Sequence, residues 1–170
     1  MSATPIAEHA LLSDRHSCAL VDKAGSVEWL CFPRFDSPSV FGRLLDDAAG
    51  HWSIRPDGRY DVSRRYLDRT MVLETTFRTG AGSVVLVDAL AAGADNQGHL
   101  LGPGAPHLLI REVACTAGRV DLELQYVPRP EHGHVMPLLS AVDGGVRARG
   151  GADCLVLSAP VRLDVGRSSA

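Results

Sequence analysis

Short runs of alternating apolar and polar residues, separated by turn-forming residues, constrain this chain more than any other feature. The 170 residues include 17 glycines and 10 prolines, and these interrupt most apolar runs before they reach helical length. From Val120 to Tyr126 every second residue is apolar, which is typical of a strand with one buried face. Many short strands joined by Gly and Pro turns predict an all-β fold, an antiparallel β-sandwich.

The turn residues also predict which strands are neighbours. Two runs joined by a short glycine-containing turn form a hairpin, and the sequence offers three such pairs: 17–21 with 26–32, 71–78 with 82–90, and 107–116 with 119–127. Valine and leucine occupy every position from Val84 to Val87, which predicts a strand covered on both faces. Further strands are expected at 51–55, 61–67, 138–142, 145–149, 154–158 and 162–165, and residues 91–106 are expected to form a surface loop.

One short amphipathic helix is the predicted exception to the all-β pattern. Asp36 or Ser37 can cap its start, Pro38 fits its first turn, and Gly50 marks its end. Its apolar side would consist of Val40, Phe41, Leu44 and Leu45.

The strand-like pattern continues almost to the last residue. We therefore expect residues 1–170 to form one β-sandwich domain, super-sandwich-like and truncated at its C-terminal end, which would leave an unpaired edge.

Charge and hydropathy exclude several classes of protein. The net charge is -3 and the basic residues are scattered, whereas nucleic acids and anionic membranes select concentrated positive patches. No apolar run is long enough for a membrane span, and residues 1–12 lack the pattern of an export signal, so a cytoplasmic location is expected. Cys18 and Cys31 could face each other across a hairpin, but buried thiols are favoured over a disulfide at such a location.

Standard catalytic and metal-binding patterns are missing from the sequence. It contains no GxSxG, HExxH or phosphate-binding loop, and the adjacent residues 14–17 (Asp-Arg-His-Ser) do not have the spacing of a triad. His132 and His134 lack a third metal ligand nearby, so neither a metal nor another cofactor is expected. Glycosidases need two carboxyl groups, yet no pair stands out among Glu28, Asp36, Glu74, Asp88 and Glu112.

The segment 29–38 concentrates chemistry that could bind a ligand. Trp29 and Phe35 offer flat apolar faces of the kind that contact sugar rings, and Arg34 and Asp36 can hydrogen bond to hydroxyl groups or to each other. The alternative is structural, with the aromatic side chains in the core and Arg34 and Asp36 forming a corner.

Residues 26–41, SVEWLCFPRFDSPSVF, resemble the opening signature of bacterial glycoside hydrolase family 15 proteins, in the region called the trehalase-like N-terminal domain. Residues 71–79, MVLETTFRT, are similar to a later strand of that family, and residues 87–90 and 128–133 match further landmarks in the family's order. Departures are small: Glu28, Phe32 and His132 stand where Asp, Leu and Tyr are commoner. Several motifs in order over nearly the whole chain make the resemblance specific.

The resemblance implies a β-sandwich followed by an α/α barrel that carries paired catalytic glutamates. The family's enzymes are inverting hydrolases of α-glucosidic bonds, acting on trehalose or, in the glucoamylase-like members, on maltooligosaccharides. Nothing here resembles the barrel, so this chain alone is predicted to be inactive and the barrel is its expected partner. The resemblance adds a role for Trp29, Pro33, Arg34, Phe35 and Asp36 at the barrel, either lining the entrance for an α-glucoside or packing between domains.

Other interpretations remain open. A stand-alone carbohydrate-binding module is one, although aromatic residues make up only 5% of the chain. A structural interaction domain that pairs with a barrel or with a second copy of itself is another.

Overall fold

The computed structural model describes residues 4–93 and 102–170, and the fold in these residues is almost entirely β. A single 3-10 turn, η1 (Ile6–Glu8), precedes the first strand. The strands are β1 (Ala10–Ser13), β2 (Cys18–Val21), β3 (Ser26–Cys31), β4 (Ser39–Phe41), β5 (His51–Pro56), β6 (Asp61–Tyr66), β7 (Leu73–Arg78), β8 (Gly82–Leu90), β9 (Leu109–Gly118), β10 (Leu122–Val127), β11 (Leu138–Val142), β12 (Gly145–Gly150) and β13 (Asp153–Ser158).

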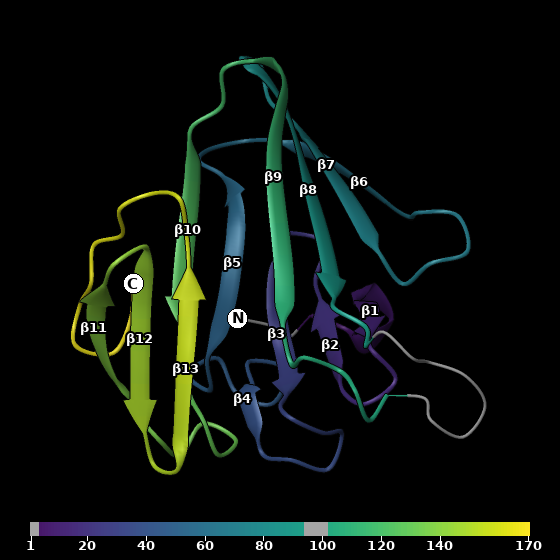
Figure 1. The fold of residues 1–170 in the computed structure, drawn as a ribbon. Coiled ribbons are helices and arrows are strands. Elements are labelled where there is room, and N and C mark those ends of the chain that lie inside the picture. Colours follow the sequence, from purple (N-terminus) through teal and green to yellow (C-terminus); the bar gives the residue numbers. More distant parts are fainter. Residues whose placement is uncertain (1–3, 94–101) are drawn as a thin grey trace.

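The strands form three antiparallel sheets in a sandwich (Figure 1). The largest has the order β1-β2-β3-β5-β10, with β4 beside β3. A four-stranded sheet, β6-β7-β8-β9, and a three-stranded sheet, β11-β12-β13, pack against its inner face. All three sheets contribute to one core, which includes Val27, Phe41, Leu73, Leu109, Tyr126, Val146 and Leu157. The prediction of an all-β sandwich is therefore confirmed.

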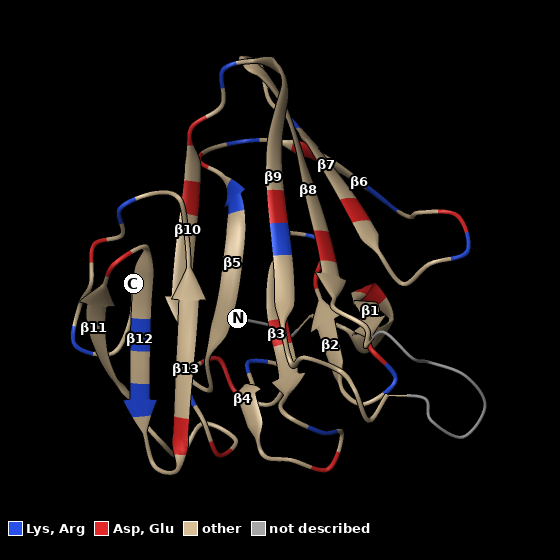
Figure 2. Cartoon of the chain, viewed as in Figure 1, with Lys and Arg blue, Asp and Glu red and all other residues tan. Residues whose placement is uncertain are grey.

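Charged residues of both signs are interspersed along the strands and loops (Figure 2). Among the residues that the structure describes, no helix has the length and apolar character that a membrane crossing requires.

Alternation in the sequence matches burial wherever one face of a strand packs inward. In β7, Leu73, Thr75 and Phe77 are buried while the residues between them are half-buried. Two of the predicted hairpins are present, β2 with β3 and β7 with β8. In β8, Val84 and Leu86 are buried while Val85 and Val87 are only half-buried, so the second face of this strand is less covered than predicted.

The predicted helix near residues 38–49 is wrong. Residues 39–41 instead form β4, all three of whose residues are buried, and β4 pairs with β3. Turns follow, in which the Leu44 N–H donates to the Glu28 carbonyl, and Leu45 is 66% exposed. Pairing with an existing sheet satisfies the backbone of this segment and buries Phe41, which outweighs the helical spacing of its apolar residues.

Two other predictions about strands are also wrong. Strands β9 and β10 do not form a hairpin, because β9 pairs with β8 and β10 pairs with β5 in the opposite layer. The connection between them crosses from one sheet to the other, as sandwiches require at some of their turns. Residues 162–165 form no strand. The predicted loop 91–106 lies partly outside the described residues.

A buried ion pair joins the two layers. Arg111 on β9 donates to both carboxylate oxygens of Asp88 on β8, at 2.8 and 3.3 Å, and neither side chain is exposed. The same guanidinium donates to the carbonyls of Trp52 and Gly25 on the opposite layer, at 2.6 and 2.7 Å, and lies 5.1 Å from the centre of the Trp52 ring. Gly25 has φ +75°, and a Cβ there would lie 2.6 Å from the Ile54 carbonyl oxygen, so this close approach requires glycine.

We expect Asp88→Ala to lower the free energy of unfolding by about 3–5 kcal/mol, because it leaves the Arg111 charge buried without its partner. Urea denaturation of the purified chain measures the change. The double variant Asp88→Leu/Arg111→Met, which removes both charges, should be more stable than the single variant. Asp121→Ala, at an exposed ion pair with Arg119, is the control, and an equal loss there would contradict the interpretation.

Candidate functional site

The loop between β3 and β4 forms an exposed corner built from Pro33, Arg34, Phe35 and Asp36. Arg34 donates to both oxygens of Asp36, at 2.8 and 3.1 Å, so the two side chains form a planar bidentate pair. The Phe35 ring is 55% exposed. The corner therefore presents a cation, a carboxylate and an aromatic ring to solvent within four consecutive residues.

Backbone contacts from the β1–β2 turn hold this corner in place. The Phe35 N–H donates to the His16 carbonyl at 3.0 Å. Asp14, whose side chain is buried, accepts hydrogen bonds from the N–H groups of His16 and Ser17, at 2.8 and 2.6 Å. The Ser17 hydroxyl in turn donates to the Cys31 carbonyl at the end of β3. The corner is thus prearranged by groups outside it, which lowers the entropy lost on binding a partner.

Further rings and charges surround the corner. Arg15 and His16 line a shallow pocket together with Arg34, Phe35 and Asp36. The His107 ring, from the segment that enters β9, lies 5.6 Å from the His16 ring and 6.1 Å from that of Phe32. Arg15 and His107 both have positive φ, at 68° and 53°, a conformation that non-glycine residues adopt at a cost and that is concentrated at functional sites.

The charge state of the corner follows from its ion pair. The hydrogen bond that Arg34 donates to Asp36 lowers the pKa of Asp36 and raises the pKa of Arg34. Both groups are therefore charged at neutral pH. Because they are exposed, they are available to hydrogen bond to hydroxyl groups or to opposite charges on a partner.

Trp29 lies on β3, before the exposed corner in the chain, and adjoins a β-bulge. Leu20 pairs with Trp29 but Val21 pairs with Val27, so Glu28 is the extra residue on β3. Trp29 is half-buried and its ring stacks on that of His132, at 6.1 Å between centroids. The structure thus brings Pro33, Arg34, Phe35 and Asp36 together and gives Trp29 a packing contact of its own.

Most of the carboxylates considered as catalytic acids contact a basic side chain. Glu28 lies 3.0 Å from the buried His9 ring, Glu74 accepts from Arg65 at 2.6 Å, and Asp36 and Asp88 have the arginine partners described above. Glu112 is exposed on β9. Among residues 4–93 and 102–170 no three potential ligands gather into a metal site, and His132, one of the two histidines considered for metal binding, instead packs on Trp29.

The cysteines are free thiols in the structure; Cys31 is buried as predicted, whereas Cys18 is half-buried. Burial, followed by the influence of Cys18, raises the pKa of Cys31 to about 11. Cys31 is therefore a protonated, unreactive thiol at neutral pH.

The outer face of the six-stranded sheet carries a polar row that sequence analysis did not single out. His51, Ser53 and Arg55 alternate with core residues along β5, and their neighbours on β10 are Gln125, 3.0 Å from His51, and Glu123, 3.0 Å from Arg55. The alternation in residues 51–55 was the available signal. Burial lowers the pKa of His51 from 6.5 to about 4, and nearby arginines lower it further.

Comparison with known proteins identifies the class to which this sandwich belongs. The sequence profile of the family described as "Trehalase-like, N-terminal" matches residues 1–168. The chain therefore belongs to the trehalase-like N-terminal family. No solved structure matches it significantly.

Several curated relatives are named trehalases. Those of Mycolicibacterium smegmatis and Mycobacterium tuberculosis are 41% and 42% identical, over 77% and 73% of this chain but only 21% and 20% of their own lengths. Trehalase 1 of Sulfolobus acidocaldarius is 38% identical over 86% of this chain and 24% of its own length. The match thus spans about a fifth to a quarter of the length of these three relatives.

The depressed pKa of His51 predicts a pH-dependent stability. The unfolded chain binds a proton at this histidine near pH 6.5, whereas the folded chain does so only near pH 4. The free energy of unfolding should therefore fall as the pH is lowered from 6.5 to 4, by at most about 1.4 kcal/mol per pH unit from this group. Urea denaturation across this range should show a smaller slope for His51→Gln than for His134→Gln, an exposed control. Equal slopes would count against this role.

Proposed function

We propose that this chain is the non-catalytic N-terminal domain of an inverting hydrolase of α-glucosidic bonds, a trehalase of glycoside hydrolase family 15. The observation that supports this most is the match of residues 1–168 to the trehalase-like N-terminal family, together with trehalases that are several times longer than the matched segment. On this proposal the catalytic acids belong to a downstream α/α barrel of the same polypeptide. No cofactor is assigned to the sandwich, and a cytoplasmic location stays a prediction.

The exposed corner is the part of the sandwich to which we assign contact with the barrel. Its aromatic ring and its two charged side chains are held by backbone contacts from the β1–β2 turn, yet they point away from the core. A prearranged, exposed arginine beside an aromatic residue is typical of protein interfaces. Arg34, Phe35 and Asp36 would then fix the barrel against the sandwich and border the entrance for the α-glucoside. Pro33 belongs to the same surface, and Trp29 would support it through the His132 loop.

Two alternatives differ from this proposal in class. The chain could be a stand-alone carbohydrate-binding domain or a structural domain that pairs with a second copy of itself. The substrate of the parent enzyme could also be a maltooligosaccharide. Calorimetric titration of the isolated chain with trehalose and maltotriose distinguishes a carbohydrate-binding domain from the proposed function, because only a binding domain would give saturable heat. Sedimentation velocity separates the second by its dependence on concentration.

The purified 170-residue chain should not hydrolyse trehalose or maltose. Glucose release, followed by a coupled assay over several hours, measures this, and the polypeptide that includes the sequence downstream of residue 170 is the positive control. Turnover that co-purifies with the short chain would overturn the assignment of the catalytic acids to a separate domain.

In the polypeptide that includes the barrel, Arg34→Ala should lower kcat/KM for trehalose about tenfold, a loss of about 1.4 kcal/mol in transition-state stabilisation. The loss is expected because the variant removes the bidentate pair with Asp36 and one charge from the interface. Arg149→Ala, at an exposed position on β12, is the matched control. Equal activities of the two variants would discard the role of the corner, and thermal unfolding of both would show whether stability explains a difference.

A further inference from the structure

Two strand edges face each other across an opening in one layer of the sandwich. β9 is the last strand of the four-stranded sheet and β13 is the last strand of the three-stranded sheet, and among the described strands each pairs with one neighbour. Figure 1 shows the upper end of β13 beside the lower end of β9, with no described strand between them, and both border the same groove. Both therefore carry a row of main-chain N–H and C=O groups that can pair with a further strand.

The interior of the sandwich is incompletely covered beside this opening. Val113 on β9 pairs with the fully buried Leu86 and faces inward with it, yet Val113 is 39% exposed. In the opposite layer Leu122 on β10 pairs with the buried Pro56 and faces the same interior, yet it is 38% exposed. These two inward-facing apolar residues are thus partly open to solvent, and the side chains of a further strand could cover them.

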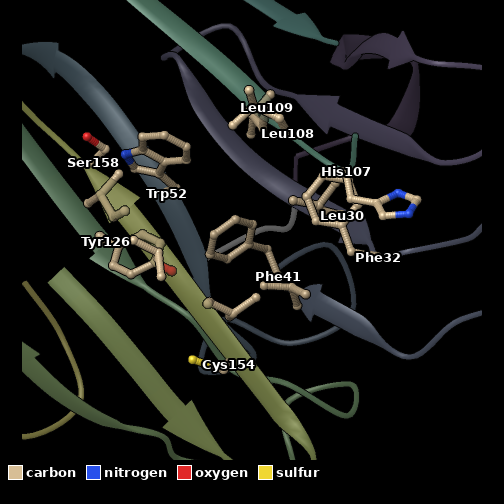
Figure 3. A pocket seen from close by; sticks show the side chains of 14 residues that line it. Leu30, Phe32, Phe41, Trp52, His107, Leu108, Leu109, Tyr126, Cys154 and Ser158 are labelled. Atoms are coloured by element: carbon tan, nitrogen blue, oxygen red, sulfur yellow. The ribbon is translucent and has the colours of Figure 1, made fainter. Parts of the chain in front are cut away.

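An apolar groove of about 240 Å³ lies at the lower part of the opening. Figure 3 shows its lining: the segment His107–Leu109, which leads into β9, forms one wall, β13 forms the other, and Trp52, Phe41 and Tyr126 lie at its base. The indole Nε1 of Trp52 is buried and has no hydrogen-bond acceptor among the residues that the structure describes. The groove thus combines apolar walls with a buried donor that a carbonyl group could satisfy.

We propose that this opening receives an extended strand of the same polypeptide, from beyond residue 170, which pairs with the free edges of β9 and β13. An extended strand matches both walls, because it offers main-chain partners on its two sides and alternate side chains to the interior. The inward-facing residues of this strand should be apolar and should cover Val113 and Leu122. One of its carbonyls should accept from Trp52.

The origin of the strand in the same polypeptide is argued from two observations. Ala170 exchanges two backbone hydrogen bonds with Tyr126, at 2.6 and 2.9 Å, so the described chain ends on the edge of β10 opposite β5, and the Tyr126 side chain lines the groove. The trehalases that the chain matches extend far beyond the matched segment. The inference rests on the proposed function in this one respect, that the sandwich is part of a longer polypeptide.

Thiol labelling of Val113→Cys tests this strand. In the 170-residue chain the new thiol should react readily with a maleimide. In the polypeptide that continues past residue 170 its rate should fall by about tenfold or more, because labelling then requires the strand to open. Mass spectrometry of the peptides separates this thiol from the natural ones. Asp68→Cys, an exposed position in the β6–β7 turn, should react equally in both polypeptides.

Each outcome of this experiment has a defined meaning. An unchanged labelling rate for Val113→Cys in the longer polypeptide overturns the proposed strand. Protection of this thiol in the 170-residue chain that rises with protein concentration also overturns it, because a second copy of the chain would then fill the opening. Leu122→Cys, on the other wall, serves as a second reporter if Val113→Cys does not fold. Trehalose hydrolysis is measured on the same preparations. Hydrolysis without protection of the Val113→Cys thiol contradicts the proposed strand alone, and protection of the thiol without hydrolysis contradicts the proposed function alone.

Discussion

The ion pair between Asp88 and Arg111 is the interaction on which the rest of the sandwich depends. Both side chains are fully buried, and the arginine also donates to carbonyls of Gly25 and Trp52 in the opposite layer. A buried charge is costly unless all its donors have partners, so this pair specifies how the layers align as well as holding them together. Gly25 allows the close approach because it carries no side chain.

Hydrogen bonds within the six-stranded sheet and its turns decide where the exposed corner lies. Asp14 orders the β1–β2 turn, the His16 carbonyl accepts from Phe35, and Ser17 is bonded to the end of β3. Arg34 and Asp36 can then satisfy each other at the surface without help from the core. The sandwich therefore behaves as a rigid support that presents a small set of polar and aromatic groups, which suits a domain whose partner performs the chemistry.

Local patterning predicted most strands because the period of alternation is a property of each segment alone. Residues 71–90 are an example: the buried face of β7 and the hairpin with β8 both follow from the order of their residues. Prediction failed where another element competed for the backbone. The apolar spacing from Val40 to Leu45 suits a helix, but Ser39 and Phe41 pair with an available edge of β3 instead. The sequence of residues 39–45 alone does not indicate that this edge is available.

The sequence by itself determined the all-β class, the family resemblance and the residues of the corner, since these depend on short-range order and composition. Only the tertiary structure decided that β9 and β10 lie in opposite layers, that Trp29 packs on His132 away from the corner, and that β9 and β13 leave an opening between their edges. The physical reason is that strand pairing is non-local. A strand's alternation specifies which side chains face inward, whereas its partner is chosen by the packing of the whole core.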